Sequence, residues 1–229
     1  MSSREFWAAE AAKMRDTSTL FDMSHLAPSS RNKKNSPGAW EIGSRWDDQK
    51  IAEFRAFLGG AINAIETKKE TYACEDFAVT LVMTFAKENK LPFKWVTGSQ
   101  KFDADIWGGM ASFTSSVRAR TGAKDVQNNT NTTKISLQSA QKGDMILLNG
   151  KEKYAHHVQI IYNVGENKID IKQGNEGSFF VKYPTTIQTA VYNLGDDSYE
   201  NKSTGHKVKN YSQEEDIEFR IFNFKQWND

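Results

Sequence analysis

Hydrophobic positions change their spacing along the chain. Between residues 47 and 67 the apolar side chains recur three and four residues apart, which predicts a long amphipathic helix. After Lys142 they gather in short β-rich runs separated by Gly, Asn or Asp, which is typical of strands joined by turns. The expected strands are 144–148, 157–164, 168–173, 189–194 and 217–224. Helices followed by an antiparallel meander predict an α+β fold.

A second helix is predicted to begin at Cys74 or within one turn of it. Apolar side chains form two stripes down to Ala86, and Pro92 ends the segment. Acidic Glu75 and Asp76 stand in the first turn, where the helix dipole favours negative charge. Thr71 is the expected capping residue.

The first part of the chain has a different character. Residues 24–37 are rich in Ser, Asn, Lys and Pro and lack a helical or strand period. We therefore expect an N-terminal arm over 1–46, wrapped on a main domain over 47–229. Residues 98–134 show no clear period either and are expected to form loops with a short helix.

Composition narrows the function classes. The chain has 229 residues, enough for a substantial core, and 30 basic against 29 acidic side chains give a net charge of +1. That balance gives no reason to expect a nucleic-acid partner, and no apolar run reaches the roughly 18 residues of a membrane span. Glu5 and Glu10 interrupt the N-terminal segment, so we do not expect a cleaved signal peptide. We expect the protein to be made in the cytoplasm.

Cys74 is the only cysteine and the first candidate for chemistry. A helix N-terminus favours the thiolate, which is the nucleophilic form, and its backbone amides can donate to an oxyanion. The alternative is that Cys74 only fills the core, since free cysteines are often buried. With one thiol in the chain, a structural zinc site is not expected.

Four histidines are available as a base: His25, His156, His157 and His206. His156 and His157 open a predicted strand, where adjacent side chains point to opposite faces, so only one can face Cys74. One strand later, Gln173 and Asn175 carry amides that can accept from an imidazole N–H. Gln173 and Asn175 are two residues apart, so in a strand both would point to the same face and spacing does not tell which one orients the imidazole. The alternative is that Gln-Gly-Asn is only an ordinary turn sequence.

Four segments in this order resemble the papain-like NlpC and CHAP group of bacterial cell-wall amidases and peptidases. They are Tyr72-Ala-Cys-Glu-Asp-Phe-Ala, Lys142-Gly-Asp-Met-Ile-Leu, His157-Val-Gln-Ile-Ile-Tyr and Gln173-Gly-Asn. The resemblance implies a papain-like fold, with the nucleophile at a helix N-terminus packed on an antiparallel sheet. Ala-Cys-Glu-Asp stands where the commoner pattern is Asp-Cys-Ser-Gly.

The same resemblance assigns roles to individual residues. Cys74 is the expected nucleophile and His157, which stands before Val-x-Ile, is the expected base. Asn175 is the first choice for the residue that orients the imidazole, and Gln173 is the alternative. Tyr72 is expected near the oxyanion or the substrate. Lys142-Gly-Asp144 is expected to be a structural turn.

The implied reaction is hydrolysis of an amide bond in peptidoglycan peptides, without a metal or organic cofactor. Together with the expected lack of a signal peptide, the resemblance implies an antibacterial effector. A specialised secretion system would deliver it to the periplasm of a target cell, and its producer would hold a cognate immunity protein; a phage lysin would also lack a signal. Two other classes stay open: an acyltransferase or deamidase acting on a protein, and an inactive binding module.

Overall fold

Helix α2 (Asp48–Lys68) begins where the sequence turns amphipathic, as predicted. In the computed structural model, which describes residues 38–150, 154–174 and 184–229, Asp47 caps this helix by accepting from the Lys50 N–H at 2.7 Å. Residues 38–46, the end of the predicted arm, belong to the same unit as α2, and Trp46 is buried. The rest of the arm, 1–37, lies outside the described residues.

Helix α3 (Cys74–Glu88) starts at the predicted position, with Cys74 as its first residue. The expected cap is wrong: Thr71 lies in strand β1 (Thr71–Tyr72), and Ala73 occupies the N-cap without a side-chain hydrogen bond. The helix is buried on more than one side, since Phe77, Ala78, Val79 and Val82 are inaccessible to solvent. Such a helix belongs to the interior of a domain. Among the described helices, none is long and apolar enough to cross a membrane.

The main sheet has eight antiparallel strands in the order β11-β10-β9-β7-β6-β5-β12-β4. Strands β5, β6, β7 and β9 follow each other as the predicted meander, β10 and β11 extend it, and β12 returns to pair with β5. The bounds are β4 Thr132–Ile135, β5 Met145–Leu148, β6 His157–Val164, β7 Lys168–Gln173, β9 Gln188–Asn193, β10 Ser198–Asn201, β11 Lys207–Lys209 and β12 Ile217–Phe222.

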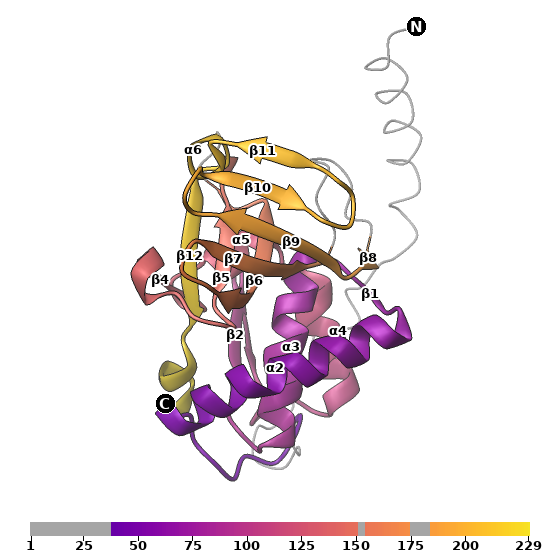
Figure 1. Ribbon diagram of the computed structural model, residues 1–229. Helices are drawn as coiled ribbons and strands as arrows, with labels where there is room; N and C mark the ends of the chain where they lie inside the picture. Colours follow the sequence, from indigo (N-terminus) through magenta and orange to yellow (C-terminus); the bar gives the residue numbers. More distant parts are fainter. Residues whose placement is uncertain (1–37, 151–153, 175–183) are drawn as a thin grey trace, which may run out of the picture. The chain divides into compact units, whose positions relative to one another are not determined.

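Both faces of the sheet are covered in its middle. Met145 and Leu147 of β5 point into a core shared with α2 and α3, whereas Ile146 and Leu148 point into a second core. The second core lies among β6, β7, β9, β10 and the short helix α6 (Tyr211–Glu214). Burial on both faces explains why β5 reads as the continuous apolar run Met-Ile-Leu-Leu. The two long helices α2 and α3 lie on one side of the sheet (Figure 1).

The expectation of loops with a short helix over 98–134 is correct for the helix but misses two strands and a second helix. This region holds β3 (Gln100–Asp103), α4 (Met110–Arg120), α5 (Ala123–Gln127) and β4. Strand β3 forms a two-residue hairpin with β2 (Lys94–Thr97), and Gly98 adopts a φ of +53° in the turn. A hairpin of four-residue strands gives too few alternations for a period to stand out.

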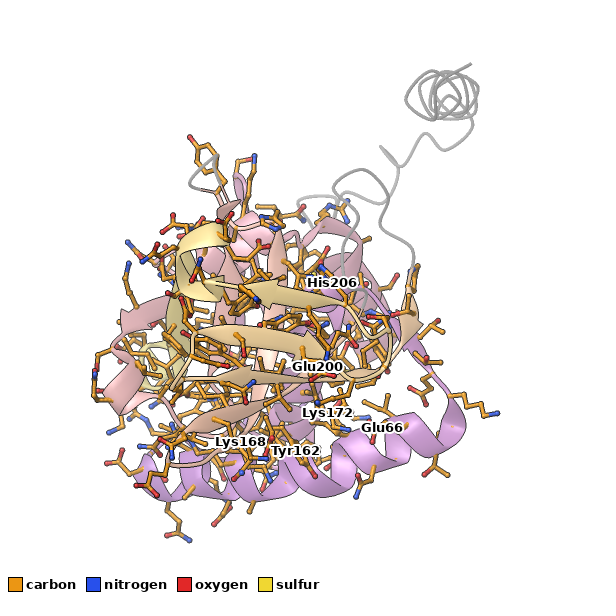
Figure 2. All side chains as sticks on the ribbon, turned by 45° about the horizontal axis from the view of Figure 1, so that its top comes forward. Glu66, Tyr162, Lys168, Lys172, Glu200 and His206 are labelled. Atoms are coloured by element: carbon orange, nitrogen blue, oxygen red, sulfur yellow. The ribbon has the colours of Figure 1, made fainter. Side chains whose placement is uncertain are left out.

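A polar contact joins α2 to the sheet. Lys172 of β7 donates to Glu66 of α2, and its ammonium lies 5.5 Å from the ring centroid of Tyr162 in β6. Figure 2 shows these three side chains together above α2. A lysine on a covered face is tolerated because its charge is paired. The contact holds α2 against the face that also receives α3.

Candidate active site

Three segments that are distant in sequence meet at the start of α3. Gly174, directly after β7, lies so close to the carbonyls of Tyr72 and Ala73 that a Cβ there would approach them to 2.7 and 2.8 Å. Only glycine allows that approach. Val158, the second residue of β6, packs in the same core as Cys74; burial raises the pKa of the thiol, and the Val158 backbone lowers it. Cys74, the start of β6 and the end of β7 therefore lie close together.

Cys74 is buried, with 6% of its surface exposed, and its partner is a carboxylate. The thiol donates to Oε2 of Glu75 at 2.9 Å, and Glu75 is itself 3% exposed. Burial raises the pKa of Cys74, and the charge and hydrogen bond of Glu75 raise that pKa further. The prediction from the helix N-terminus was the reverse, a thiolate. The resting group is therefore a thiol.

His157, the first residue of β6, is buried and oriented by Gln173. Its Nε2 lies 3.1 Å from Oε1 of Gln173, the last residue of β7. The same oxygen accepts from Nε2 of Gln159 at 2.7 Å. Of the two amides that the sequence offered as the orienting group, the structure brings Gln173 to the imidazole. Asn175 lies outside the described residues.

A polar network surrounds this pair on the second face of the sheet. Tyr211 of α6 donates to Oε1 of Gln159 at 2.9 Å, and Nε2 of Gln173 donates to the Tyr199 hydroxyl at 2.9 Å. Tyr199 and Tyr211 stack with ring centroids 4.6 Å apart. Buried polar groups that satisfy one another in this way hold a single geometry. The His157 side chain therefore lies on the second-core face of the sheet, whereas Val158 and Ile160 point to the face that receives α3.

The prediction that His156 and His157 point to opposite faces of the sheet is wrong. His156 precedes β6, so the alternation of strand side chains does not govern it, and both His156 and His157 border the same cavity of about 70 Å³. His156 also lies 3.7 Å from the carboxylate of Glu215. His206, assigned by sequence to a Lys-rich loop, borders this cavity too. Its other lining residues are Leu148, Gln159, Tyr199, Val208, Tyr211 and Glu215.

Tyr72 lies beside the nucleophile, in β1, but its hydroxyl is engaged elsewhere. The hydroxyl donates to Glu70 at 2.7 Å, and the Arg118 guanidinium lies 5.2 Å from the ring centroid. Burial and the Glu70 hydrogen bond raise the pKa of Tyr72 to about 12. Tyr72 therefore keeps its proton and points it toward Glu70 in this state.

An open hollow of about 440 Å³ lies between α3 and α4. Small side chains of α4 form one wall, and Asp76 of α3 and Arg118 of α4 form an ion pair across it at 3.7 Å. The α4 residues are Ala111, Thr114, Ser115 and Ala119. Asp76 is two residues from Cys74 in the chain, but Cys74 itself is not among the residues that line this hollow.

Asp144 has the structural role that the sequence predicts. Its carboxylate accepts from the Gln141 N–H at 2.8 Å and pairs with Arg55 of α2 at 3.3 Å, while Gly143 takes a φ of +90° in the turn. Burial raises the pKa of Asp144 to about 6 despite these partners. Among the described residues, no group of three His, Cys, Asp or Glu side chains is placed to hold a metal ion.

Sequence reasoning missed four residues of this locality: Glu75, Gln159, Tyr199 and Tyr211. Gln159 carried a signal, because a glutamine inside the apolar run His-Val-Gln-Ile-Ile needs a buried hydrogen-bond partner. Glu75 was assigned to the helix dipole, and its burial depends on tertiary packing. The two tyrosines come from segments far along the chain, and no local pattern connects them to His157.

Comparison with known proteins identifies no relative of this chain. No family model matches the chain, and the curated proteins and the solved structures likewise gave no match.

Proposed function

We propose that the protein is a cysteine hydrolase of papain-like architecture, with Cys74 as nucleophile, His157 as base and Gln173 as the orienting residue. The observation that carries the proposal is the hydrogen bond between His157 Nε2 and Gln173 Oε1, since the residue after His157, Val158, packs with Cys74 in the first core. A nucleophile, a base and a group that orients the base are the parts that such catalysis needs.

The reaction follows from these parts. His157 takes the proton of the Cys74 thiol as sulfur attacks an amide carbonyl, and N–H groups at the start of α3 stabilise the oxyanion. The C–N bond breaks, His157 protonates the leaving amine, and water then hydrolyses the thioester. Because Glu75 keeps the resting thiol protonated, His157 acts as a general base on a thiol, without a preformed ion pair.

The proposed substrate is a peptide of peptidoglycan, in keeping with the resemblance at Cys74, His157 and Asn175, with Gln173 as the alternative to Asn175. The protein would act as an antibacterial effector, carried by a specialised secretion system into the periplasm of a target cell, and a cognate immunity protein would protect its producer. The open hollow beside Asp76 and Arg118 offers both signs of charge to a stem peptide, which carries free carboxylates and amines.

One observation favours a second candidate, an inactive binding module. Cys74 is buried and hydrogen-bonded to Glu75, as a cysteine with only a packing role can be. Digestion of purified sacculi, read by mass spectrometry, separates the two candidates. Wild type should release muropeptides and Cys74→Ala should release none while keeping its circular dichroism spectrum. Equal release by both would remove Cys74 as nucleophile, and none from either would favour the binding module.

A further inference from the structure

A chain of side-chain hydrogen bonds crosses the sheet from the β10–β11 turn to His157. Nδ2 of Asn201 donates to Oε1 of Gln188 at 2.9 Å, and Nε2 of Gln173 donates to the same oxygen at 3.3 Å. Oε1 of Gln173 then faces His157. A side-chain amide can be turned end for end, so the direction of such a chain must be fixed by a group that cannot be reversed.

Two backbone N–H groups fix that direction at the far end. The N–H groups of Ser203 and Thr204 donate to Oδ1 of Asn201 at 2.9 and 3.1 Å. Because a backbone N–H can only donate, the oxygen of Asn201 must face the turn and its nitrogen must face Gln188. Gln188 therefore presents its oxygen, and Gln173 must present its nitrogen to Gln188 and its oxygen to His157.

We infer that this chain sets the tautomer of His157. Oε1 of Gln173 can only accept, so Nε2 of His157 carries a proton, and Nδ1 is the nitrogen that takes up a proton in catalysis. Gln159 supports the same direction by donating to that oxygen and accepting from Tyr211. Asn201, Gln188 and Gln159 are positioning residues. The use of Nδ1 as base rests on the proposed function, but the tautomer does not.

Two variants that add the same negative charge distinguish the effect of the direction of the hydrogen-bond chain from the effect of the charge itself. In Asn201→Asp, the carboxylate still accepts from Ser203 and Thr204 but has no N–H for Gln188. Gln188 must then turn its nitrogen toward residue 201, Gln173 must turn in response, and the His157 proton must move to Nδ1. Gln188→Glu adds the same charge but keeps oxygen facing both Asn201 and Gln173, so the proton should stay on Nε2.

The readout is the ¹⁵N shifts of the imidazole nitrogens in the neutral state, with the His157 signals identified by their loss in His157→Gln. Wild type and Gln188→Glu should show Nε2–H, and Asn201→Asp should show Nδ1–H. A proton on Nδ1 in wild type, or a folded Asn201→Asp with the wild-type tautomer, would overturn the inference. If Asn201→Asp does not fold, Gln188→Lys is the second variant, because a lysine at this half-buried position can only donate. It should move the His157 proton to Nδ1, and a proton that stays on Nε2 in Gln188→Lys would overturn the inference equally.

Turnover of sacculi gives the functional counterpart. A wrong tautomer should lower kcat on the order of 10³-fold in Asn201→Asp with KM nearly unchanged, while Gln188→Glu should stay within about tenfold of wild type. A wild type with Nε2–H and no hydrolysis would remove the proposed function and leave the inference standing. Equal losses of kcat in Asn201→Asp and Gln188→Glu, with their tautomers unequal, would refute the link from tautomer to catalysis.

Discussion

The thiol of Cys74 donates a hydrogen bond to the carboxylate of Glu75, 2.9 Å away, at the first turn of α3. Both residues are buried, so little water screens the carboxylate from the sulfur. A helix N-terminus favours negative charge on that sulfur, whereas burial and the neighbouring carboxylate disfavour it. The opposing carboxylate and the burial prevail here, and they raise the pKa of the nucleophile.

Replacing Glu75 should therefore activate the thiol. Glu75→Gln removes the charge and the strong acceptor, so the pKa of Cys74 should fall and alkylation by iodoacetamide at pH 8 should become several-fold faster. Each unit of pKa changes the thiolate fraction about tenfold at pH values below the pKa. Asp76→Asn is the matched control, because it removes the next charge on the helix, which pairs with Arg118. Equal alkylation rates in wild type and Glu75→Gln would show that Glu75 does not hold the proton on sulfur.

The two neighbouring histidines should differ in their effect on activity. His157→Ala removes the proposed base and should lower kcat by roughly 10²–10⁴-fold. His156→Ala should retain activity within about tenfold, because His156 faces Glu215 and has no part in the Gln173 pair. Sacculus turnover by the two folded variants measures this. Comparable losses would mean that the His156–Glu215 pair takes part in the reaction.

Gln173 should matter through orientation. Gln173→Ala removes the acceptor of His157 Nε2 and should lower kcat by roughly tenfold, less than loss of the base itself. Gln173→Glu keeps an acceptor oxygen and should recover part of the rate. Asn175→Ala is the comparison, since the sequence pattern left both amides open. A larger loss in Asn175→Ala than in Gln173→Ala would transfer the orienting role to Asn175.

The parts of this fold that the sequence predicts are those with a strong period. Helix α2 and the strands β6 and β7 lie within one residue of their expected bounds, because each buries a regular apolar stripe. Strands β10 and β11 were missed. They are short and polar, and they are held by pairing with β9 and with each other. Their stability comes from neighbours in space, which a local pattern does not report.

The candidate site also has parts that the sequence predicts and parts that depend on tertiary packing. Cys74 and His157 could be chosen because residue type, helix start and strand start coincide in the sequence. The protonation state of Cys74 could not, since the burial of Glu75 against the thiol is a property of packing. Nor could the direction of the amide chain to His157, because it is fixed by the N–H groups of Ser203 and Thr204.

Asp144 should make stability depend on pH. Burial raises its folded pKa to about 6 from an ordinary value of 3.8, so the folded state binds this proton more tightly than the unfolded chain. Stability from this group is therefore fully present below pH 3.8 and is lost as the pH rises through 6, by about 3 kcal/mol. Asp144→Asn cannot ionise. Urea unfolding of both proteins between pH 4 and 8 should show wild type losing stability relative to Asp144→Asn as the pH rises. A difference in unfolding free energy that stays constant over this range would contradict the prediction.

The last prediction concerns the compartment in which the protein acts. If Cys74 and His157 cleave peptidoglycan peptides, production in the bacterial cytosol should be tolerated, because that substrate is absent there. Fusion to a periplasmic signal peptide should cause lysis, and Cys74→Ala should abolish the lysis while the exported protein remains folded. The measurement is culture turbidity together with muropeptide release, and a signal-peptide fusion of His156→Ala serves as a control that keeps the nucleophile and the proposed base. An acyltransferase or deamidase acting on a protein predicts the opposite, with Cys74-dependent toxicity in the cytosol and intact sacculi. That result would replace the cell wall with a protein substrate while keeping the same nucleophile and base.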